Sequence, residues 1–275
     1  MWIGSGSGSQ TPLVFLDLSY YVFYRYFALQ TWIKLSKTQF QSKTEEFEKY
    51  CELFENHILN LQKKFHFDWK DLYVCKDCPR HDVWRLKLFP KYKTPATTTK
   101  QINPEIFPYT YETVLPKLVQ KYGFHVVGYK TAEADDVAGV LKPHFRKLYP
   151  ERSIIIVTND NDYLQLLDDH TQIINAAYKH INTRIPPEFE SPDKSKCISC
   201  YTLWKIIKGD KSDTIPSIGK KIGDKVALKL VLNKDLLCSV LDANPEVKAQ
   251  FELNKKLMLF SEIPDNIQKG ILKSI

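Results

Sequence analysis

The chain has 275 residues, 43% of them hydrophobic, which is enough apolar material for a true core in one or two domains. Its formal net charge is +7 at pH 7, and such a balance favours a polyanionic partner such as nucleic acid, although basic charge that serves only solubility is a common alternative. No apolar run approaches the about 18 residues of a membrane span, and the N-terminus lacks the apolar stretch of a signal peptide. We therefore expect an intracellular protein, in the cytoplasm, the nucleus or a viral replication site, that is not secreted and contacts no membrane.

Four short, largely apolar runs predict strands, at residues 13–16, 72–75, 125–127 and 154–157. An aromatic-rich helix is expected after Asp17. A second helix is predicted to begin at Ser42, which with Glu45 has the spacing of a capping box, and its apolar face recurs every three or four residues from Phe47 to Phe65. Strands that alternate with helices in this way predict an α/β fold with a central, mainly parallel sheet.

The rest of the chain is rich in basic residues and in helical pattern. Residues 85–93 interleave Arg and Lys with apolar side chains, and residues 94–108 predict an irregular connection because they contain three successive threonines and three prolines. A helix is predicted over residues 111–122, bent or broken at Pro116 and ended by Gly123. After about Pro192 the sequence becomes helical, with ten lysines between Lys194 and Lys234.

Six cysteines in a chain of this size do not indicate a disulfide scaffold. Two pairs, Cys75/Cys78 and Cys197/Cys200, have a CxxC spacing that suits tetrahedral zinc ligation. Because the pairs lie far apart in the sequence and Cys75 ends an apolar run, buried reduced thiols are the expected state, with a shared zinc site as the alternative.

Three carboxylates, Glu133, Asp135 and Asp136, fall within four residues at the predicted start of a helix. The helix macrodipole favours anions there, so a generous N-terminal cap is one reading. Three neighbouring anions nevertheless repel one another, and a divalent cation would stabilise them. Further acids follow other elements, namely Asp17, Asp77, Asp160, Asp162, Asp210 and Asp213. Acids at the ends of three predicted strands favour the metal interpretation, because ligands bind at that edge of such sheets.

The order of these motifs resembles the flap endonuclease and 5′–3′ exonuclease family, especially the ribonuclease H-like 5′ nucleases of bacteriophages and the 5′ nuclease domain of bacterial DNA polymerase I. The resemblance covers nearly the whole chain from about Leu13. The matching motifs are Asp17-x-Ser19, Asp77, Glu133-Ala134-Asp135-Asp136, Asn159-Asp160-Asn161-Asp162 and the run from Gly209 to Pro216.

The resemblance implies a PIN-like nuclease core over residues 12–192, in which residues 84–108 form a basic arch or loop. Residues 193–275 would carry a helix-three-turn-helix, a relative of the helix-hairpin-helix, and C-terminal helices. Residues 1–11, with their Gly/Ser-rich stretch, are expected to form a flexible N-terminal segment.

The activity that the resemblance implies is structure-specific hydrolysis of DNA near a 5′ flap, nick or end in replication or repair, by a monomer. RNA primers and RNA–DNA hybrids remain open as further substrates. Two divalent ions, Mg²⁺ or Mn²⁺, would serve the reaction, since hard ions take carboxylate ligands. The alternatives are a non-catalytic DNA-binding factor on the same scaffold and a PIN-type ribonuclease.

The resemblance also implies roles for individual residues. The first ion would be held by Asp17, Asp77, Glu133 and Asp135, and the second by Asp135, Asp160, Asp162 and Asp210. Asp136 and Asp213 match extra acids that act through water. Lys93 and Arg85 match basic residues over the scissile phosphate, where they would stabilise developing charge.

Other basic residues would contact DNA without reading its sequence. Lys87 and Lys91 would steer phosphates, and Tyr92 would stack on a terminal base, with simple packing as the alternative. The hairpin of residues 215–223 and the following helix would grip the duplex backbone, through Gly219, Lys220, Lys221, Gly223, Lys225 and Lys229. Family members often bind K⁺ in this hairpin, but the family's Gly-hydrophobic-Gly is Lys221-Ile222-Gly223 here, which puts a K⁺ site in doubt.

Overall fold

The computed structural model describes residues 11–94, 102–181, 185–189 and 194–275, and at its centre lies a parallel sheet of five strands in the order β3-β2-β1-β4-β5. The strands are β1 (Leu13–Asp17), β2 (Leu72–Lys76), β3 (His125–Gly128), β4 (Ile154–Val157) and β5 (Thr171–Ile174). The four strands predicted from apolar runs are confirmed. The sequence did not indicate β5, because Thr171 and Gln172 interrupt its apolar character.

The strand order creates a reversal point between β1 and β4. From β1 the chain adds β2 and then β3 on one side, and it returns to add β4 and β5 on the other. Leu16 lies opposite Val157 in register, so the carboxyl ends of β1 and β4 are neighbours. In open α/β sheets a crevice forms at such a point, outside the carboxyl ends of the strands.

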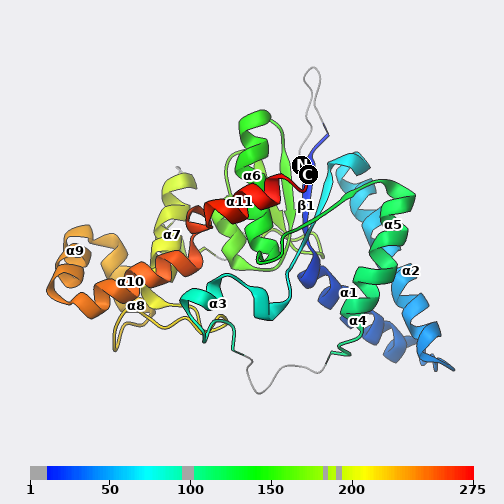
Figure 1. Cartoon of the computed structure of the whole chain (residues 1–275), viewed down its shortest axis with the longest axis horizontal. Helices are drawn as coiled ribbons and strands as arrows, with labels where there is room; N and C mark the ends of the chain where they lie inside the picture. Colours follow the sequence, from blue (N-terminus) through cyan, green and yellow to red (C-terminus); the bar gives the residue numbers. More distant parts are fainter. Residues whose placement is uncertain (1–10, 95–101, 182–184, 190–193) are drawn as a thin grey trace.

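Helices cover both faces of the sheet (Figure 1). Val14 and Leu16 point to the face covered by α1 (Leu18–Ser36), α2 (Lys43–Phe65) and α5 (Leu115–Tyr122). Leu13 and Phe15 point to the face covered by α6 (Ala134–Leu148) and by the C-terminal helices. Ser42 is the N-cap of α2, and its hydroxyl accepts a hydrogen bond from the backbone N–H of Glu45 at 3.2 Å. The predicted capping box is only half formed, because the Glu45 carboxylate accepts from the backbone N–H of Gln41 at 2.9 Å instead of from Ser42. Both faces of a parallel sheet are thereby buried, as its apolar strands require.

Residues 106–122 form one helical run that changes its pitch before Pro116. It consists of α4 (Ile106–Tyr109), a π-helical segment (Thr110–Val114) and α5. Pro116 lies in the first turn of α5, and the widened turn directly before it accommodates the missing N–H donor. The helix ends at Gly123, which has a φ of 78°, as predicted. Of the connection predicted over residues 94–108, residues 95–101 lie outside the described part, and α4 begins earlier than expected.

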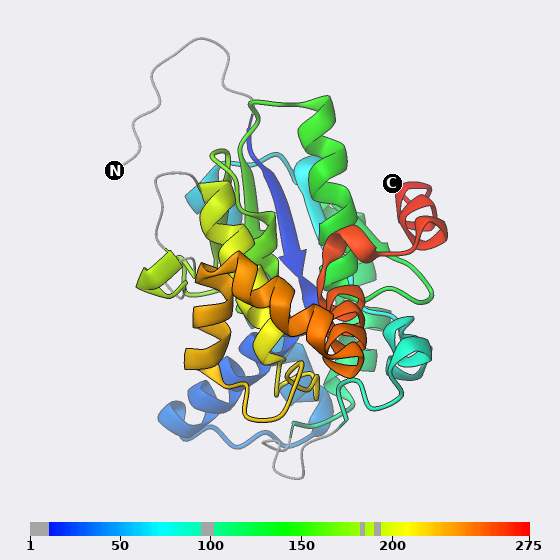
Figure 2. The same cartoon turned by 90° about the vertical axis from the view of Figure 1, so that its left-hand side faces the viewer.

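The C-terminal part is helical. Its helices are α7 (Lys194–Lys208), α8 (Asp224–Leu232), α9 (Lys234–Ala243), α10 (Pro245–Met258) and α11 (Asp265–Leu272). Figure 2 views them from the side of α9, with α7, α8 and α10 in front of the sheet. The short helix α3 spans Arg85–Leu88, and 3₁₀ segments lie at Trp69–Asp71, Arg80–Asp82, Asn161–Leu166, Pro187–Phe189 and Phe260–Glu262. The expected α/β class with a helical C-terminal part is confirmed.

The loop between α7 and α8 turns back on itself at Gly209. This residue has a φ of +77°, and an added Cβ would lie 2.4 Å from the carbonyl carbon of Pro216, so only glycine fits. Paired backbone hydrogen bonds between Asp210 and Ile215 close the following turn. Ile207, Ile215 and residues of α10 belong to the same apolar cluster as the α6 side of the sheet, so the C-terminal helices share a core with it. In the described part of the chain, no helix combines the length and apolarity that a bilayer span requires.

Candidate active site

Six of the predicted acids line one cavity of about 480 Å³, which we call the acidic pocket. They are Asp17, Asp77, Glu133, Asp135, Asp160 and Asp213, and the ammonium-bearing Lys93 lines it with them. The ends of β1, β2 and β4 and the start of α6 position five of the acids, whereas Lys93 comes from the segment after α3 and Asp213 from the loop between α7 and α8. The pocket therefore lies at the reversal point between β1 and β4, where sequence reasoning placed the ligand-binding edge.

Asp17 and Asp77 are held in place by short hydrogen bonds. Oγ1 of Thr158 donates to Oδ2 of Asp17 at 2.7 Å, and the backbone N–H of Ala134 donates to Oδ1 of Asp77 at 2.8 Å. Ser19, the third residue of the predicted Asp-x-Ser motif, donates to Oδ2 of Asp77. Burial, together with the negative charge of Asp77, raises the pKa of Asp17 to about 7. Burial likewise raises the pKa of Asp77. The two side chains are thus rigid, close and costly to ionise together.

At the start of α6, carboxylate oxygens of Glu133, Asp135 and Asp136 lie within 4.8 Å of one another. The cap interpretation is also correct, because Glu133 is the N-cap of α6 and its backbone N–H donates to Oδ2 of Asp136 at 3.0 Å. Burial, with Asp136 and Glu133 nearby, raises the pKa of Asp135 well above its usual range, although Arg85 opposes the shift. Asp135 lines the acidic pocket, so burial disfavours the charge of a carboxylate that is well placed for a cation.

Arg85 does not lie over the acidic pocket, and its predicted place above a phosphate is corrected. The side chain is 1% exposed, with Nη1 2.8 Å from Glu133 and Nη2 2.7 Å from Asp136. Its Nε donates to the backbone carbonyl of Leu257 in α10 at 2.7 Å. Arg85 therefore orients Glu133 and Asp136 from inside the core, and its side chain links α3 to α6 and α10.

Asp136 is fully buried and does not line the acidic pocket. Oδ1 accepts from Arg85, and Oδ2 accepts from Arg85, from the indole Nε1 of Trp84 at 2.9 Å and from the backbone of Glu133. With both oxygens engaged by protein donors, Asp136 orients Glu133 and Arg85. Its predicted part in metal binding thereby becomes an indirect one.

Tyr92 and Lys93 approach Glu133 from the other side. The Tyr92 side chain is 4% exposed and its hydroxyl donates to Oε2 of Glu133 at 3.1 Å, so base stacking is wrong and the packing alternative is confirmed. Nζ of Lys93 lies 2.7 Å from Oε1 of Glu133, and its side chain is 35% exposed. Burial opposes the charge on Glu133, but Lys93 and Arg85 outweigh it and lower its pKa. Lys93 is thus the basic residue that lines the acidic pocket. Its backbone N–H donates a hydrogen bond to the backbone carbonyl of Asp213 at 2.9 Å.

Asp210 lines a second cavity of about 990 Å³, the turn pocket, whereas Asp162 is not among the lining residues of either cavity. The turn pocket adjoins the acidic pocket, because both are lined by Asn161 and Ser212. Nζ of Lys205, on α7, forms ion pairs with Asp162 and, at 2.8 Å, with Asp210. Burial opposes the charges of this group, yet the charge of Lys205 lowers the pKa of Asp210. Two of the four predicted ligands of the second ion, Asp162 and Asp210, therefore pair with a lysine that sequence reasoning missed, whereas Asp135 and Asp160 line the acidic pocket. A lone lysine in the apolar run of residues 203–207 was the available signal.

Tyr163 was also missed. Its side chain is buried at the wall of the acidic pocket, and in the described structure its hydroxyl has no hydrogen-bond partner. Unsatisfied buried hydroxyls are rare, and one that faces a group of acids indicates room for a water or an ion's hydration shell. The residue directly follows the Asn-Asp-Asn-Asp motif, which gave the only hint to it.

The predicted DNA-binding lysines lie on the surface. Lys87, Lys91, Lys220, Lys221, Lys225 and Lys229 are all exposed. Gly219 and Gly223 flank the turn that leads into α8. Lys221, which stands where the family has its first glycine, has a φ of 64°, a left-handed conformation that glycine adopts without strain.

The cysteines do not form the zinc site considered above. No disulfide joins the cysteines of the two CxxC pairs, and the metal-compatible cluster found among the described residues, at the start of α6, includes none of them. Burial raises the pKa of Cys75 well above its usual range and that of Cys78 to about 12, so both thiols are protonated at neutral pH. Reduced thiols, the expected state, agree with this environment.

Comparison with known proteins finds relatives for most of the chain. The family described as 5′–3′ exonuclease, N-terminal resolvase-like domain, matches residues 12–190. The DNA polymerase I of Streptococcus pneumoniae serotype 4 is 29% identical over 154 residues, which cover 54% of this chain and 16% of the polymerase. A 5′–3′ exonuclease of Buchnera aphidicola subsp. Schizaphis graminum is 25% identical over 227 residues, covering 80% of this chain and 69% of the relative. The chain thus spans about a sixth of the length of the polymerase.

Solved structures share the fold. T5 5′-exonuclease with bound divalent metal ions (zinc) has a TM-score of 0.64 at 18% identity, over 95% of this chain and 98% of that one. A pseudo-enzyme–product complex of the bacteriophage T5 flap endonuclease with DNA and metal ions has a TM-score of 0.63 at 16% identity, over 94% and 96% of the two chains. With the sheet order, the acidic pocket and the match over residues 12–190 together, the chain belongs to the family of the 5′–3′ exonuclease N-terminal resolvase-like domain.

Proposed function

We propose that the protein is a metal-dependent nuclease that hydrolyses phosphodiester bonds near a 5′ flap, nick or end of DNA. The observation that carries the proposal is the acidic pocket, in which six carboxylates and Lys93 meet at the reversal point of the sheet. The Buchnera relative is a 5′–3′ exonuclease, and the T5 flap endonuclease was solved with DNA and metal ions. Their activities support the same reaction here.

The residues of the pocket fit divalent cations. The donors are carboxylate oxygens, which Mg²⁺ and Mn²⁺ prefer, and the pocket offers no thiol or imidazole ligand among its described lining residues. Burial and mutual repulsion raise the pKa values of Asp17, Asp77, Asp135 and Asp160, and a bound cation would relieve that cost. The unpartnered hydroxyl of Tyr163 leaves space for hydration.

Two ions would be held by different sets of acids. Asp17, Asp77, Glu133 and Asp135 would hold the first, and Asp135, Asp160, Asp162 and Asp210 the second. When bound, such ions supply an activated water and neutralise charge on the leaving oxygen. Lys205 pairs with Asp162 and Asp210. The second site would therefore accept an ion only after the Lys205 ammonium moves away from these two carboxylates.

The chain's own residues would position the substrate. Lys93 presents its ammonium at the mouth of the pocket, where it would stabilise negative charge that develops on the phosphate. Arg85 and Asp136 hold Glu133 in place without touching the substrate. The exposed lysines of the turn and of α8 would bind duplex phosphates, a contact that needs no particular sequence.

The test is cleavage of a 5′-labelled flap and a nicked duplex with Mg²⁺ or Mn²⁺. Wild-type protein should cut near the 5′ end, whereas Asp160→Asn and Asp135→Asn should abolish cleavage but retain DNA binding. Asp235→Asn, a matched change at an exposed aspartate of α9, should leave cleavage intact. Cleavage that survives both pocket changes would refute the proposal. DNA binding without cleavage by wild type would indicate a non-catalytic factor, and cleavage confined to single-stranded RNA would indicate a ribonuclease.

A further inference from the structure

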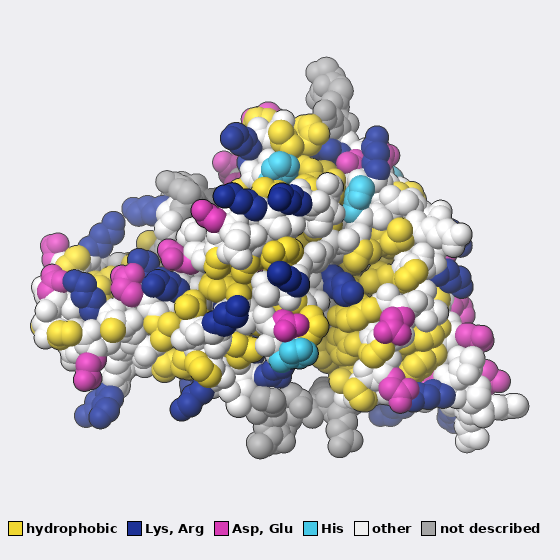
Figure 3. Space-filling model, viewed as in Figure 1, with side chains coloured by type: hydrophobic (Ala, Val, Ile, Leu, Met, Phe, Trp, Pro, Cys, Tyr) yellow, Lys and Arg dark blue, Asp and Glu magenta, His cyan; other side chains and the backbone are white. Residues whose placement is uncertain are grey.

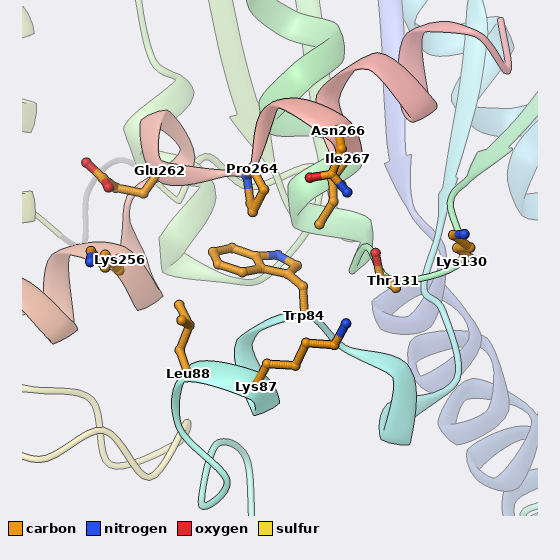
Figure 4. A pocket seen from close by; sticks show the side chains of 10 residues that line it. All are labelled: Trp84, Lys87, Leu88, Lys130, Thr131, Lys256, Glu262, Pro264, Asn266 and Ile267. Atoms are coloured by element: carbon orange, nitrogen blue, oxygen red, sulfur yellow. The ribbon is translucent and has the colours of Figure 1, made fainter.

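A second concave site lies between α3 and the start of α11, away from the acidic pocket. We call it the Trp84 pocket; it encloses about 510 Å³ and shares no lining residue with the acidic pocket. Figure 4 shows the indole of Trp84 at its centre, between Leu88 of α3 on one side and Pro264 and Ile267 on the other. The middle of the site is therefore apolar, as in pockets that take an apolar side chain.

Basic side chains surround this apolar centre. Lys87, Lys130 and Lys256 line the site with one acid, Glu262 (Figure 4). Within the described part of the chain, none of these four charged side chains forms an ion pair. Figure 3 shows apolar surface between α3 and α11, with basic side chains on its flanks. Three unpaired cations against one anion leave a positive rim, which is complementary to an acidic ligand.

The pocket is rigid where it meets the core. The backbone N–H of Trp84 donates to the carbonyl of Thr131 at 3.1 Å, and its Nε1 donates to Asp136 at 2.9 Å. The residue is only 6% exposed, so the indole does not offer the open face on which a nucleic-acid base would stack. Leu88, in contrast, is 43% exposed and gains burial from any apolar group placed beside it.

We propose that the Trp84 pocket is a docking site for an acidic peptide segment of a partner protein, with one large apolar side chain that inserts between Leu88 and Ile267. The apolar centre selects the anchor, and the lysines around it select the negative charges beside the anchor. Interfaces commonly combine one buried anchor with a polar rim in this way.

The test uses a fluorescein-labelled peptide of acidic residues around a single phenylalanine, titrated with the full chain and followed by fluorescence anisotropy. Saturable binding is expected, and both Leu88→Ser and Lys256→Gln should weaken it by about tenfold or more. The matched controls are Leu148→Ser and Lys147→Gln, which alter an exposed leucine and an exposed lysine at the far end of α6 and should bind like wild type.

Two further probes separate the alternatives. A peptide with alanine in place of phenylalanine should lose binding, because the rim alone supplies only screened attraction. Equal binding of the alanine peptide, or equal binding by Leu88→Ser, would overturn the proposal. It would also fail if Leu88→Ser weakened binding of a single-stranded oligonucleotide rather than of the peptide. Cleavage of flap DNA by Leu88→Ser should match wild type, so this result is independent of the proposed nuclease activity.

Discussion

Nζ of Lys205 lies 2.8 Å from Oδ2 of Asp210, and the same ammonium pairs with Asp162. The lysine is 8% exposed, and although burial opposes its charge, the two acids raise its pKa. A buried cation thus lies between two predicted ligands of a metal ion. In the metal-free protein, Lys205 replaces part of the charge that an ion would supply.

Replacing this lysine should therefore separate stability from metal affinity. Lys205→Met should destabilise the metal-free protein by about 3 kcal/mol, because it leaves the carboxylates of Asp162 and Asp210, which are only 15% and 17% exposed, without their cation. It should also tighten Mn²⁺ binding by about tenfold, since no ammonium then competes for Asp162 and Asp210. Thermal unfolding in EDTA and an Mn²⁺ titration followed by electron paramagnetic resonance measure the two effects. Lys269→Met, at an exposed lysine of α11, should change neither, and unchanged Mn²⁺ affinity in Lys205→Met would contradict the competition.

Arg85 should behave as a positioning residue. Arg85→Met should lower the free energy of unfolding by about 3–5 kcal/mol, because Glu133 and Asp136 would lose a buried partner. Arg85→Lys should recover only part of the loss, since a point charge cannot replace the two-pronged pairing. Urea unfolding measures these changes, and Arg80→Met is the control at an exposed arginine. A change in DNA affinity at unaltered stability would instead place Arg85 against the substrate.

Lys93 should affect turnover rather than metal binding. Lys93→Met should reduce kcat on flap DNA by about 10²-fold to 10³-fold, the range for removal of one group that stabilises transition-state charge. Lys93 also pairs with Glu133, but Arg85 and Tyr92 still hold that carboxylate in the variant, so the Mn²⁺ affinity should change much less than kcat. Single-turnover cleavage alongside an Mn²⁺ titration gives both values. Loss of metal affinity in proportion to kcat would show that Lys93 acts only by holding Glu133.

The metal-free protein should become less stable as the pH rises from about 4 to about 7. Burial raises the pKa of Asp17 and of Asp213 from 3.8 to about 7, so in this range the folded chain binds more protons than the unfolded one. The contribution of Asp17 and Asp213 to the free energy of unfolding therefore falls until about pH 7 and is constant at higher pH. Thermal unfolding at about pH 5.5 and about pH 8 in EDTA should show this fall.

Divalent metal should reverse this pH dependence, because the ion binds the ionised carboxylates. With Mg²⁺ or Mn²⁺ present, the melting temperature should rise between the same two pH values. Asp17→Asn should show a smaller fall in EDTA and a smaller gain with metal. A metal-free melting temperature that increases over this range would contradict the assigned pKa directions.

The left-handed residue in the turn before α8 offers a test of backbone strain. Lys221→Gly should stabilise the protein by about 1 kcal/mol relative to Lys221→Ala, because glycine alone adopts a φ of 64° without a steric cost. Both variants lose the same ammonium, so a difference between them isolates the backbone effect. Urea unfolding measures it, and equal stabilities would show that the turn relaxes to another conformation.

Much of the fold followed from local patterns. Continuous apolar runs indicate buried strands whatever surrounds them, and the acids after β1, β2 and β4 must meet because parallel strands end at one edge. The start of α6 was equally local, since Glu133 and Asp136 cap the helix that follows them. β5 was missed because a short strand with polar residues carries no such pattern.

The direction of the basic side chains was decided only by tertiary packing. Arg85 and Lys93 belong to one basic stretch of sequence, yet the packing of α3 against α10 turns Arg85 inward, toward a carbonyl in another helix, while Lys93 faces the acidic pocket. Likewise, Lys205 meets Asp162 only because α7 packs beside the segment after β4. Sequence spacing determines which residues share an element, but a contact between elements depends on how their buried faces fit together.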